Sequence, residues 1–333
     1  MTDSPLILLT GATGFIGGRL AAALARRGNR LRCLVRSASK GEQLRGLGAE
    51  LIEGDVADQT VLATAMPGAH AAFHLAAIYD LGIVDATEMQ RVNVGGTRAF
   101  LDAARTAQTP RVIYVSTTAA LGPANGDQPD DDADWNGPYP SVYHRTKAEA
   151  HRLARHAQIN GLPLLVVCPA FVYGPDDTGP GGRFLRDVVR GRMPGLLAEP
   201  GWYSYVHVDD VVAGLIAALD RGSTGATYVL SGEHTSVNDF AARAARIAGV
   251  RPPRLRLPNA LASATGAFLD LIARPTGLRF PITRETVAAS DGLRWLHSHD
   301  RATRELGWSP RSLDAGLPET VIALLHPDRA PDS

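Results

Sequence analysis

Thr10-Gly11-Ala12-Thr13-Gly14-Phe15-Ile16-Gly17-Gly18 stands between two segments of different pattern. The apolar run before it, Leu6 to Leu9, is too short for a core helix, and the Ala/Leu-rich run after it, Arg19 to Arg27, has helical length. We therefore predict a strand, a tight turn and a helix. The first glycine permits a tight turn whose backbone conformation other residues rarely adopt. The second lets the backbone approach a pyrophosphate, and the third lets the helix pack closely on the strand. The pattern is typical of a dinucleotide fold, in which phosphates lie at the positive end of the helix.

The composition is that of an ordinary globular protein. The chain has 333 residues, of which 45% are hydrophobic, and 34 basic residues balance 34 acidic ones. Apart from local patches, this balance gives no attraction to nucleic acid or to an anionic membrane. No apolar run approaches the length of a membrane span. We therefore expect a cytoplasmic protein that binds neither nucleic acid nor a membrane. Cys33 and Cys168 lie in apolar runs, so we expect buried reduced thiols and no metal site.

Further apolar runs alternate with helical patterns along the first half of the chain. We expect strands at 31–36, 51–55, 71–77, 111–116 and 164–169, and helices at about 86–107 and 141–159. This alternation predicts an α/β fold, with a doubly wound parallel (Rossmann) sheet formed by residues 1–170. Beyond residue 170 the alternation stops. Residues 171–330 are expected to form mainly a smaller C-terminal α+β substrate lobe, with some segments returning to the main sheet.

Residues at the carboxyl ends of these strands fit a dinucleotide. Arg36 ends the second strand, where an acidic residue would bind the adenosine ribose and an arginine can pair with a 2'-phosphate, which favours NADP over NAD. The alternative is a solvated arginine. Asp55 ends the third strand and either accepts a hydrogen bond from adenine or caps the next helix. Small residues, Ala76 and Ala77, end the fourth strand, where a flat ring fits against the backbone. His74 is expected to be a packed core residue.

Tyr143 and Lys147 are four residues apart on a predicted helix and therefore lie on one face. A tyrosine has a pKa of about 10, but an adjacent ammonium and an oxidised nicotinamide favour the phenolate. Thr117, in a run of three hydroxyl residues after the fifth strand, would polarise a substrate oxygen while Tyr143 passes its proton and the nicotinamide passes a hydride. The alternative is an exposed Tyr/Lys pair on a helix surface.

These motifs together resemble those of the extended short-chain dehydrogenases/reductases, within the NAD-dependent epimerase/dehydratase superfamily. The resemblance covers most of the chain. It rests on 10–17, Gly54-Asp55, His74-Leu75-Ala76-Ala77, Asn93-Val94-x-Gly96-Thr97, Ser116-Thr117, Tyr143-x-x-x-Lys147, 169–175, His207-Val208-Asp209-Asp210-Val211 and Glu305-Leu306-Gly307-Trp308-x-Pro310.

The resemblance implies roles for individual residues. Thr117, Tyr143 and Lys147 would form the catalytic triad, and Asn93 would support the active-site hydrogen-bond network. Residues expected to bind the cofactor are Gly11, Thr13, Gly14, Phe15, Ile16, Gly17, Arg36, Asp55, Val56, Leu75, Ala76, Ala77, Ser116, Tyr143, Lys147, Pro169 and Val172. Paired helices at about 90–107 and 141–159 form a dimer bundle in many relatives, so a homodimer is expected.

Two departures from nucleotide-sugar enzymes bear on the substrate. Those enzymes usually have asparagine where Phe171 stands and arginine near Tyr203, whereas both positions here are aromatic. Val35-Arg36 and the long helix after residue 258 resemble the dihydroflavonol-reductase-like branch instead. Aromatic residues suggest a pocket for an apolar substrate, in which a diphosphate would be poorly compensated, although Arg183 or Arg186 could still clamp a phosphate. The candidate substrate residues are Tyr79, Thr117, Phe171, Trp202 and Tyr203.

We therefore expect an NAD(P)H-dependent oxidoreductase that reduces a ketone or aldehyde on a relatively apolar small molecule to an alcohol, with tyrosine as general acid/base. The alternative is a nucleotide-sugar epimerase or dehydratase with tightly bound NAD. A third hypothesis is a redox-sensing binding protein of the same fold. Such proteins usually have a damaged triad, and the intact residues here argue against it.

Overall fold

The computed structural model describes residues 4–82, 84–124, 135–193, 195–276, 278, 280 and 282–326. Its centre is a seven-stranded sheet in the order β10-β6-β5-β4-β1-β2-β3, and every neighbouring pair is parallel. The chain order reverses between β1 and β4, which is where open α/β sheets bind ligands. The predicted doubly wound sheet is confirmed. The strands are β1 (Leu6–Thr10), β2 (Arg30–Val35), β3 (Glu50–Glu53), β4 (Ala71–His74), β5 (Val112–Val115), β6 (Leu164–Pro169) and β10 (Thr227–Leu230).

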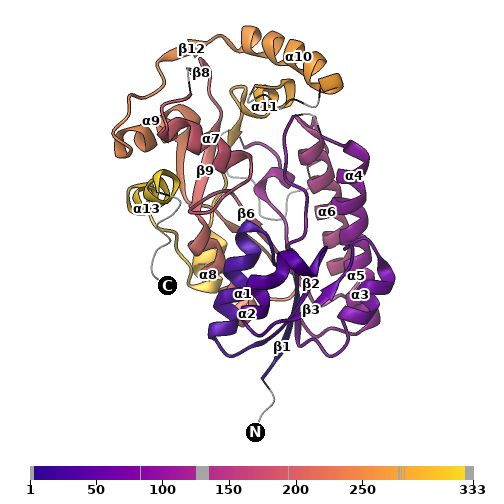
Figure 1. Cartoon of the computed structure of the whole chain (residues 1–333). Helices are drawn as coiled ribbons and strands as arrows, with labels where there is room; N and C mark the ends of the chain where they lie inside the picture. Colours follow the sequence, from indigo (N-terminus) through magenta and orange to yellow (C-terminus); the bar gives the residue numbers. More distant parts are fainter. Residues whose placement is uncertain are drawn as a thin grey trace.

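Helices cover both faces of this sheet (Figure 1). Alternate side chains of β1 enter different cores: Ile7 and Leu9 pack on one side and Leu8 on the other. A strand buried on both faces must be apolar throughout, which explains the short continuous runs in the sequence. One face carries α1 (Phe15–Arg26), α2 (Glu42–Gly46), α8 (Val208–Arg221) and α12 (Asp300–Leu306), and the other carries α3 (Gln59–Ala65), α5 (Gly96–Thr106) and α6 (Val142–Ile159).

The helix expected at about 86–107 consists of three pieces. A short helix, α4 (Ala86–Gln90), passes through a π-helical turn, Arg91–Gly95, into α5. Such turns occur often at functional sites, and this one carries Asn93. The following long helix, α6, begins after Ser141, whose side chain accepts a hydrogen bond from the backbone N–H of His144. Short 3₁₀ turns occur at Ala38–Gly41 and Thr118–Ala120.

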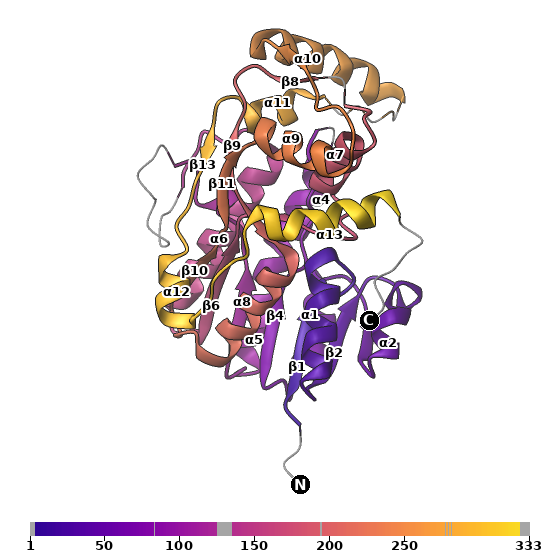
Figure 2. The ribbon, with the colours of Figure 1, turned by 90° about the vertical axis from the view of Figure 1, so that its left-hand side faces the viewer.

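The rest of the chain forms a second layer above the carboxyl edge of the sheet (Figure 2). Strand β9 (Trp202–His207) lies between β11 (Glu233–Ser236) and β13 (Arg294–Trp295), and β7 (Phe171–Tyr173) pairs with its far end. A small sheet joins β8 (Gly195–Leu197) to β12 (Leu255–Leu257). The helices here are α7 (Pro180–Val189), α9 (Val237–Ile247), α10 (Asn259–Thr276), α11 (Arg284–Ser290) and α13 (Leu313–Leu325).

Two further observations concern the expectations above. Cys33 and Cys168 are buried thiols, as predicted. Within the described ranges, no helix is both long enough and apolar enough to cross a bilayer.

Candidate active site

The glycine turn joins β1 to α1 with very little space around it. Gly11 has a φ of 75°, and a Cβ atom there would lie 2.6 Å from the backbone N of Ala76. A Cβ atom on Gly17 would lie 2.1 Å from the carbonyl oxygen of Gly11. Gly14 precedes the first helical residue, Phe15, and has no side chain to cap the helix. Thr13 completes the turn, and Ile16 is the second residue of α1. The first N–H groups of α1 thus remain available for phosphate oxygens, so the turn fits a dinucleotide.

The next two strand ends carry Arg36 and Asp55. Arg36 is exposed after β2 and close enough to Asp55 to lower the pKa of its carboxyl. The larger effect on that pKa comes from Arg91, which donates two hydrogen bonds of 2.9 and 2.7 Å to Asp55. Asp55 does not cap α3; Asp58 does, accepting from the N–H of Thr60 at 2.8 Å. The helix-capping alternative for Asp55 is therefore wrong.

The segment after β4 lies against the glycine turn. His74, at the strand end, contacts the hydroxyls of Thr10 at 2.8 Å and Thr97 at 3.0 Å, and burial lowers its pKa to about 3. It is a neutral core residue, as predicted. The chain then runs past the glycine turn as Leu75, Ala76 and Ala77. The small side chains of the two alanines leave the backbone accessible. The neighbouring Val56 is buried against Gly96.

Tyr143 lies on the first turn of α6 and meets the end of β5. Burial raises the pKa of its phenol to about 12, and the neighbouring Thr117 hydroxyl has a smaller effect that lowers it. A neutral phenol that already contacts a hydroxyl is suited to donate a proton to an oxygen placed between them. Ser116 lies one residue before Thr117 and bonds instead to Nδ1 of His151 at 2.9 Å, one partner that the sequence pattern did not indicate.

Lys147 is on the same face of α6 but has different partners from those expected. Its Nζ lies 3.3 Å from the carbonyl oxygen of Val115 and 3.5 Å from the hydroxyl of Tyr114. Burial lowers the pKa of the ammonium to about 8. In the described part of the chain, no hydrogen bond joins Lys147 to Tyr143, because the ammonium turns toward the end of β5.

Asn93 links the two segments that carry the site. Its Oδ1 accepts from the N–H of Ile78 at 2.7 Å, and its Nδ2 donates to the carbonyl of Ile78 at 3.1 Å and to the hydroxyl of Thr146 at 3.1 Å. Thr146 in turn donates to the carbonyl of Tyr143 at 3.0 Å. A buried amide therefore fixes the loop before Tyr79 relative to the turn that carries Tyr143.

An aromatic wall extends from Tyr143 toward the C-terminal layer. The rings of Tyr79 and Tyr143 are 4.8 Å apart, and those of Phe171 and Tyr203 are 5.5 Å apart. Between them lie the glycines before and within α7: a Cβ atom on Gly179 would lie 3.5 Å from the Tyr79 ring. Arg183, considered above as a phosphate clamp, pairs with Asp80 at 2.9 Å, and Arg186 contacts the carbonyl of Asp177 at 3.4 Å.

Trp202 is not brought to this wall. Neighbouring side chains in a strand point to opposite faces, so Trp202 and Tyr203 diverge. The Trp202 ring is 36% exposed and lies 5.3 Å from the guanidinium carbon of Arg294. Trp202 and Tyr203 are adjacent in the sequence and were both predicted to contact the substrate, but the pleat of β9 turns their side chains to opposite faces. Pro169 ends β6, and Val172 lies in β7 packed on the core below it.

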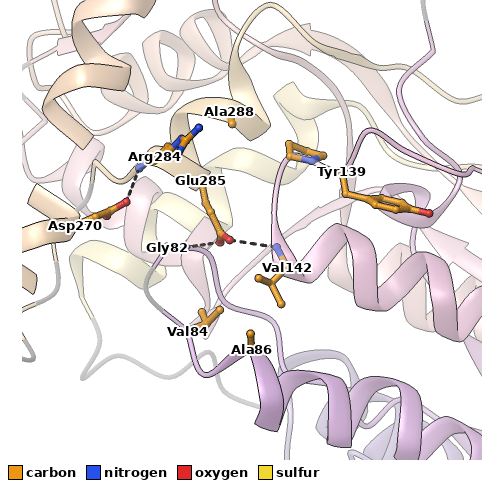
Figure 3. A pocket seen from close by; sticks show the side chains of 10 residues that line it. Gly82, Val84, Ala86, Tyr139, Val142, Asp270, Arg284, Glu285 and Ala288 are labelled. Carbon is orange, nitrogen blue, oxygen red and sulfur yellow. Dashed lines mark hydrogen bonds between the residues drawn. The ribbon is translucent and has the colours of Figure 1, made fainter. Parts of the chain in front are cut away.

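A cavity of about 600 Å³ adjoins the site and contains a residue that no sequence motif indicated. Figure 3 shows Glu285 of α11 bonded to two segments at once. Its carboxylate accepts from the N–H of Gly82 at 3.1 Å and from that of Val142 at 3.2 Å. Burial raises the pKa of this carboxyl. Glu285 is more than 140 residues from Val142, so only the folded chain reveals the contact.

Comparison with known proteins gives a consistent result. The model of the NAD dependent epimerase/dehydratase family matches residues 7–231. A protein of Methylococcus capsulatus named sterol demethylase protein B is 32% identical over 324 residues, which cover 94% of this chain and 96% of that protein. A putative dihydroflavonol 4-reductase of Synechocystis is 30% identical, with 94% and 92% covered.

Two further comparisons are relevant. A Stigmatella aurantiaca protein named 4-hydroxy-2-methyl-3-oxo-4-farnesyl-3,4-dihydroquinoline-1-oxide ketoreductase is 32% identical, with 91% of each chain covered. Among solved structures, that of gox2253 is 34% identical and superposes with a TM-score of 0.83, covering 98% of this chain and 99% of that one.

Proposed function

Because the chain belongs to the NAD dependent epimerase/dehydratase family, we propose that it is a reductase that uses NADPH to convert a ketone or aldehyde on a relatively apolar small molecule to an alcohol. The observation that carries the proposal is the position of the Thr117 hydroxyl beside the Tyr143 phenol, whose ring lies 4.8 Å from that of Tyr79. It joins the groups needed for proton transfer to the surface that would bind an apolar substrate.

The chain's own residues supply the proton chemistry. Bound NADPH would supply the hydride. The hydroxyls of Thr117 and Tyr143 would bind the carbonyl oxygen, which gains negative charge as the carbon is reduced. Tyr143 then donates its proton to that oxygen. The raised pKa of its phenol, about 12, keeps it protonated and ready to donate at neutral pH. Lys147, whose pKa is about 8, is largely charged at that pH and would stabilise the resulting phenolate by its charge, without a hydrogen bond to Tyr143.

The environment of the site supports an apolar substrate. Tyr79 presents its ring to Tyr143, and Phe171 and Tyr203 add aromatic surface on the other side of the α7 glycines. Arg183 and Asp80, charged groups next to this surface, neutralise each other in an ion pair, so a diphosphate would gain little there. The names of the relatives agree: one is called a ketoreductase of a farnesylated compound and another a dihydroflavonol reductase.

Arg36 supports NADPH in preference to NADH. Its guanidinium is exposed after β2, at the strand end where the adenosine ribose lies in dinucleotide folds. Asp55, the nearby carboxylate, is already paired with Arg91. Arg36 can therefore bind a 2'-phosphate without first breaking a strong ion pair.

A direct assay separates this function from the alternative. Purified protein would be mixed with NADPH and a panel of apolar ketones, and the loss of absorbance at the nicotinamide band followed. Steady oxidation of NADPH with formation of the alcohol supports the reductase. Turnover of a nucleotide sugar without net change in the nicotinamide would instead support an epimerase or dehydratase with tightly bound NAD, and NADPH binding without turnover of either class would indicate a sensor.

A further inference from the structure

Helix α10 is apolar on two sides. Its inner side packs on the segment before α11, where a Cβ atom on Gly266 would lie 2.6 Å from the carbonyl carbon of Thr283. Its outer side presents Leu261, Phe268 and Leu271, which are 55%, 62% and 67% exposed. These three positions follow helical spacing and share one face. A surface helix normally places charged residues on its outer face. An apolar outer face therefore indicates that this side of α10 contacts another molecule.

Exposed apolar side chains are concentrated in this part of the molecule. Five of the eleven large apolar side chains most exposed among the described residues lie within residues 255–278. Besides the three on α10, they are Leu255 and Leu278. Figure 1 places α10 at the end of the molecule farthest from the amino edge of the main sheet. The residues lie on one outer region and are not scattered singly.

The same region is basic although the whole chain is neutral. Residues 250–278 contain four arginines and a single acidic residue, Asp270. Arg251, Arg254 and Arg256 are exposed beside Leu255. Asp270 turns toward α11, where its carboxylate accepts from the backbone N–H of Arg284 at 3.2 Å. The segment 251–256 therefore adds exposed positive charge next in sequence to the apolar α10, and anionic lipid surfaces bind this combination of charge and apolar area.

This region also adjoins the site. Asp270 of α10 and Arg284 of α11 line the 600 Å³ cavity whose opposite wall includes Tyr139 and Val142, the residue before Tyr143 (Figure 3). A molecule held at the outer surface of α10 would be one helix away from that cavity.

We propose that the basic apolar surface formed by Arg251, Arg254, Arg256, Leu255, Leu261, Phe268, Leu271 and Leu278 docks on a bilayer that contains anionic lipids. Helix α10 lies in the plane of the interface with its outer apolar side chains among the lipids. No part of the surface crosses the bilayer. The benefit of docking rests on the proposed function, because an apolar substrate dissolved in the bilayer would then enter the adjoining cavity without crossing water. Charge complementarity favours lipid over a second copy of the chain, since two such basic surfaces repel each other.

Vesicle sedimentation with the full-length protein tests the docking separately from the reaction. We expect the protein to sediment with vesicles of phosphatidylcholine and phosphatidylglycerol, about fivefold less with phosphatidylcholine alone, and less as salt is raised. Phe268→Glu combined with Leu271→Glu should abolish sedimentation, and Arg254→Glu combined with Arg256→Glu should remove the preference for phosphatidylglycerol. Ile322→Glu combined with Leu325→Glu, at exposed apolar positions on α13, is the control and should bind like the wild type.

Three results would overturn the proposal. One is absence of the protein from the phosphatidylglycerol pellet. Another is a Phe268/Leu271 variant that sediments like the wild type while retaining its circular dichroism spectrum and melting temperature. The third is a wild-type oligomer, measured by light scattering, that the same variant dissociates, because a second copy would then cover the surface. Reduction of a water-soluble ketone should be equal in all variants, so loss of docking and loss of the proposed activity are distinguishable.

Discussion

The ring of Tyr79 lies 4.8 Å from the ring of Tyr143, and the planes are inclined by 52°. One residue follows β4 and the other begins α6, and Asn93 holds these two segments together. The proposed proton donor therefore lies directly against the ring of Tyr79, which is 43% exposed. In the proposed reaction, substrate binding and proton transfer would therefore use two neighbouring rings.

Tyr79→Ala should raise the KM for an apolar ketone about 3- to 10-fold, because an aromatic contact contributes about 0.5–1.5 kcal/mol. Tyr79→Phe keeps the ring and should leave KM near the wild-type value. Steady-state kinetics with one aromatic and one aliphatic ketone would measure both. Equal KM values for the alanine and phenylalanine variants would mean that the ring does not contact the substrate.

Asn93→Ala should lower both stability and kcat. The substitution leaves the buried N–H of Ile78 without its acceptor, which costs about 1–3 kcal/mol, and frees the turn that carries Tyr143. Urea denaturation and single-turnover kinetics would measure the two effects. Asn160→Ala, at the exposed end of α6, is the control and should change neither by much. A fall in stability with unchanged kcat would show that Asn93 supports the fold alone.

Lys147 gives a prediction with a definite sign. Burial lowers the pKa of its ammonium to about 8, below the ordinary value of 10.5, so between about pH 8 and 10.5 the unfolded chain binds more protons than the folded one. The contribution of Lys147 to stability therefore rises with pH across that window and is smallest below pH 8. Lys147→Met should flatten this rise in urea denaturation curves and should also reduce activity. A wild-type profile that falls between pH 8 and 10.5, with no difference from the variant, would contradict the assignment.

Arg36→Ser should shift the cofactor preference. Loss of a hydrogen-bonded charge pair costs about 1.5–3 kcal/mol, so the ratio of kcat/KM for NADPH to that for NADH should fall about 10- to 100-fold. Because the side chain is exposed, the melting temperature should stay unchanged. Arg30→Ser, at the other end of β2, should leave the ratio as it is. An unchanged ratio in Arg36→Ser would place Arg36 outside the cofactor site.

Local patterns predicted much of the fold and site. The short apolar run before the glycine turn predicted β1, because a parallel strand buried on both faces needs apolar residues throughout. The Ala/Leu-rich run after the turn has helical length and predicted α1. The spacing of Tyr143 and Lys147 gave one helix face, since that follows from helix geometry alone. The strand pleat, which separates Trp202 from Tyr203, is equally local and follows from the alternation of side chains along β9.

Contacts between residues far apart in the chain could not be predicted from local patterns in the sequence. The ammonium of Lys147 binds the end of β5, because a buried carbonyl and hydroxyl happen to lie there. Glu285 joins two loops from a helix far along the chain. The neutral total charge also gave no hint of the proposed docking surface at 251–278, since a sum over the chain carries no information about where charges gather.

The decisive experiment is the rate of NADPH oxidation by Tyr143→Phe, measured beside the wild type with the best ketone found and with NADPH affinity determined by titration. We predict a kcat about 10² to 10⁴-fold lower and an unchanged Kd for NADPH, because the substitution removes only the proton donor. A kcat within tenfold of the wild type would contradict the assignment of Tyr143 as the general acid.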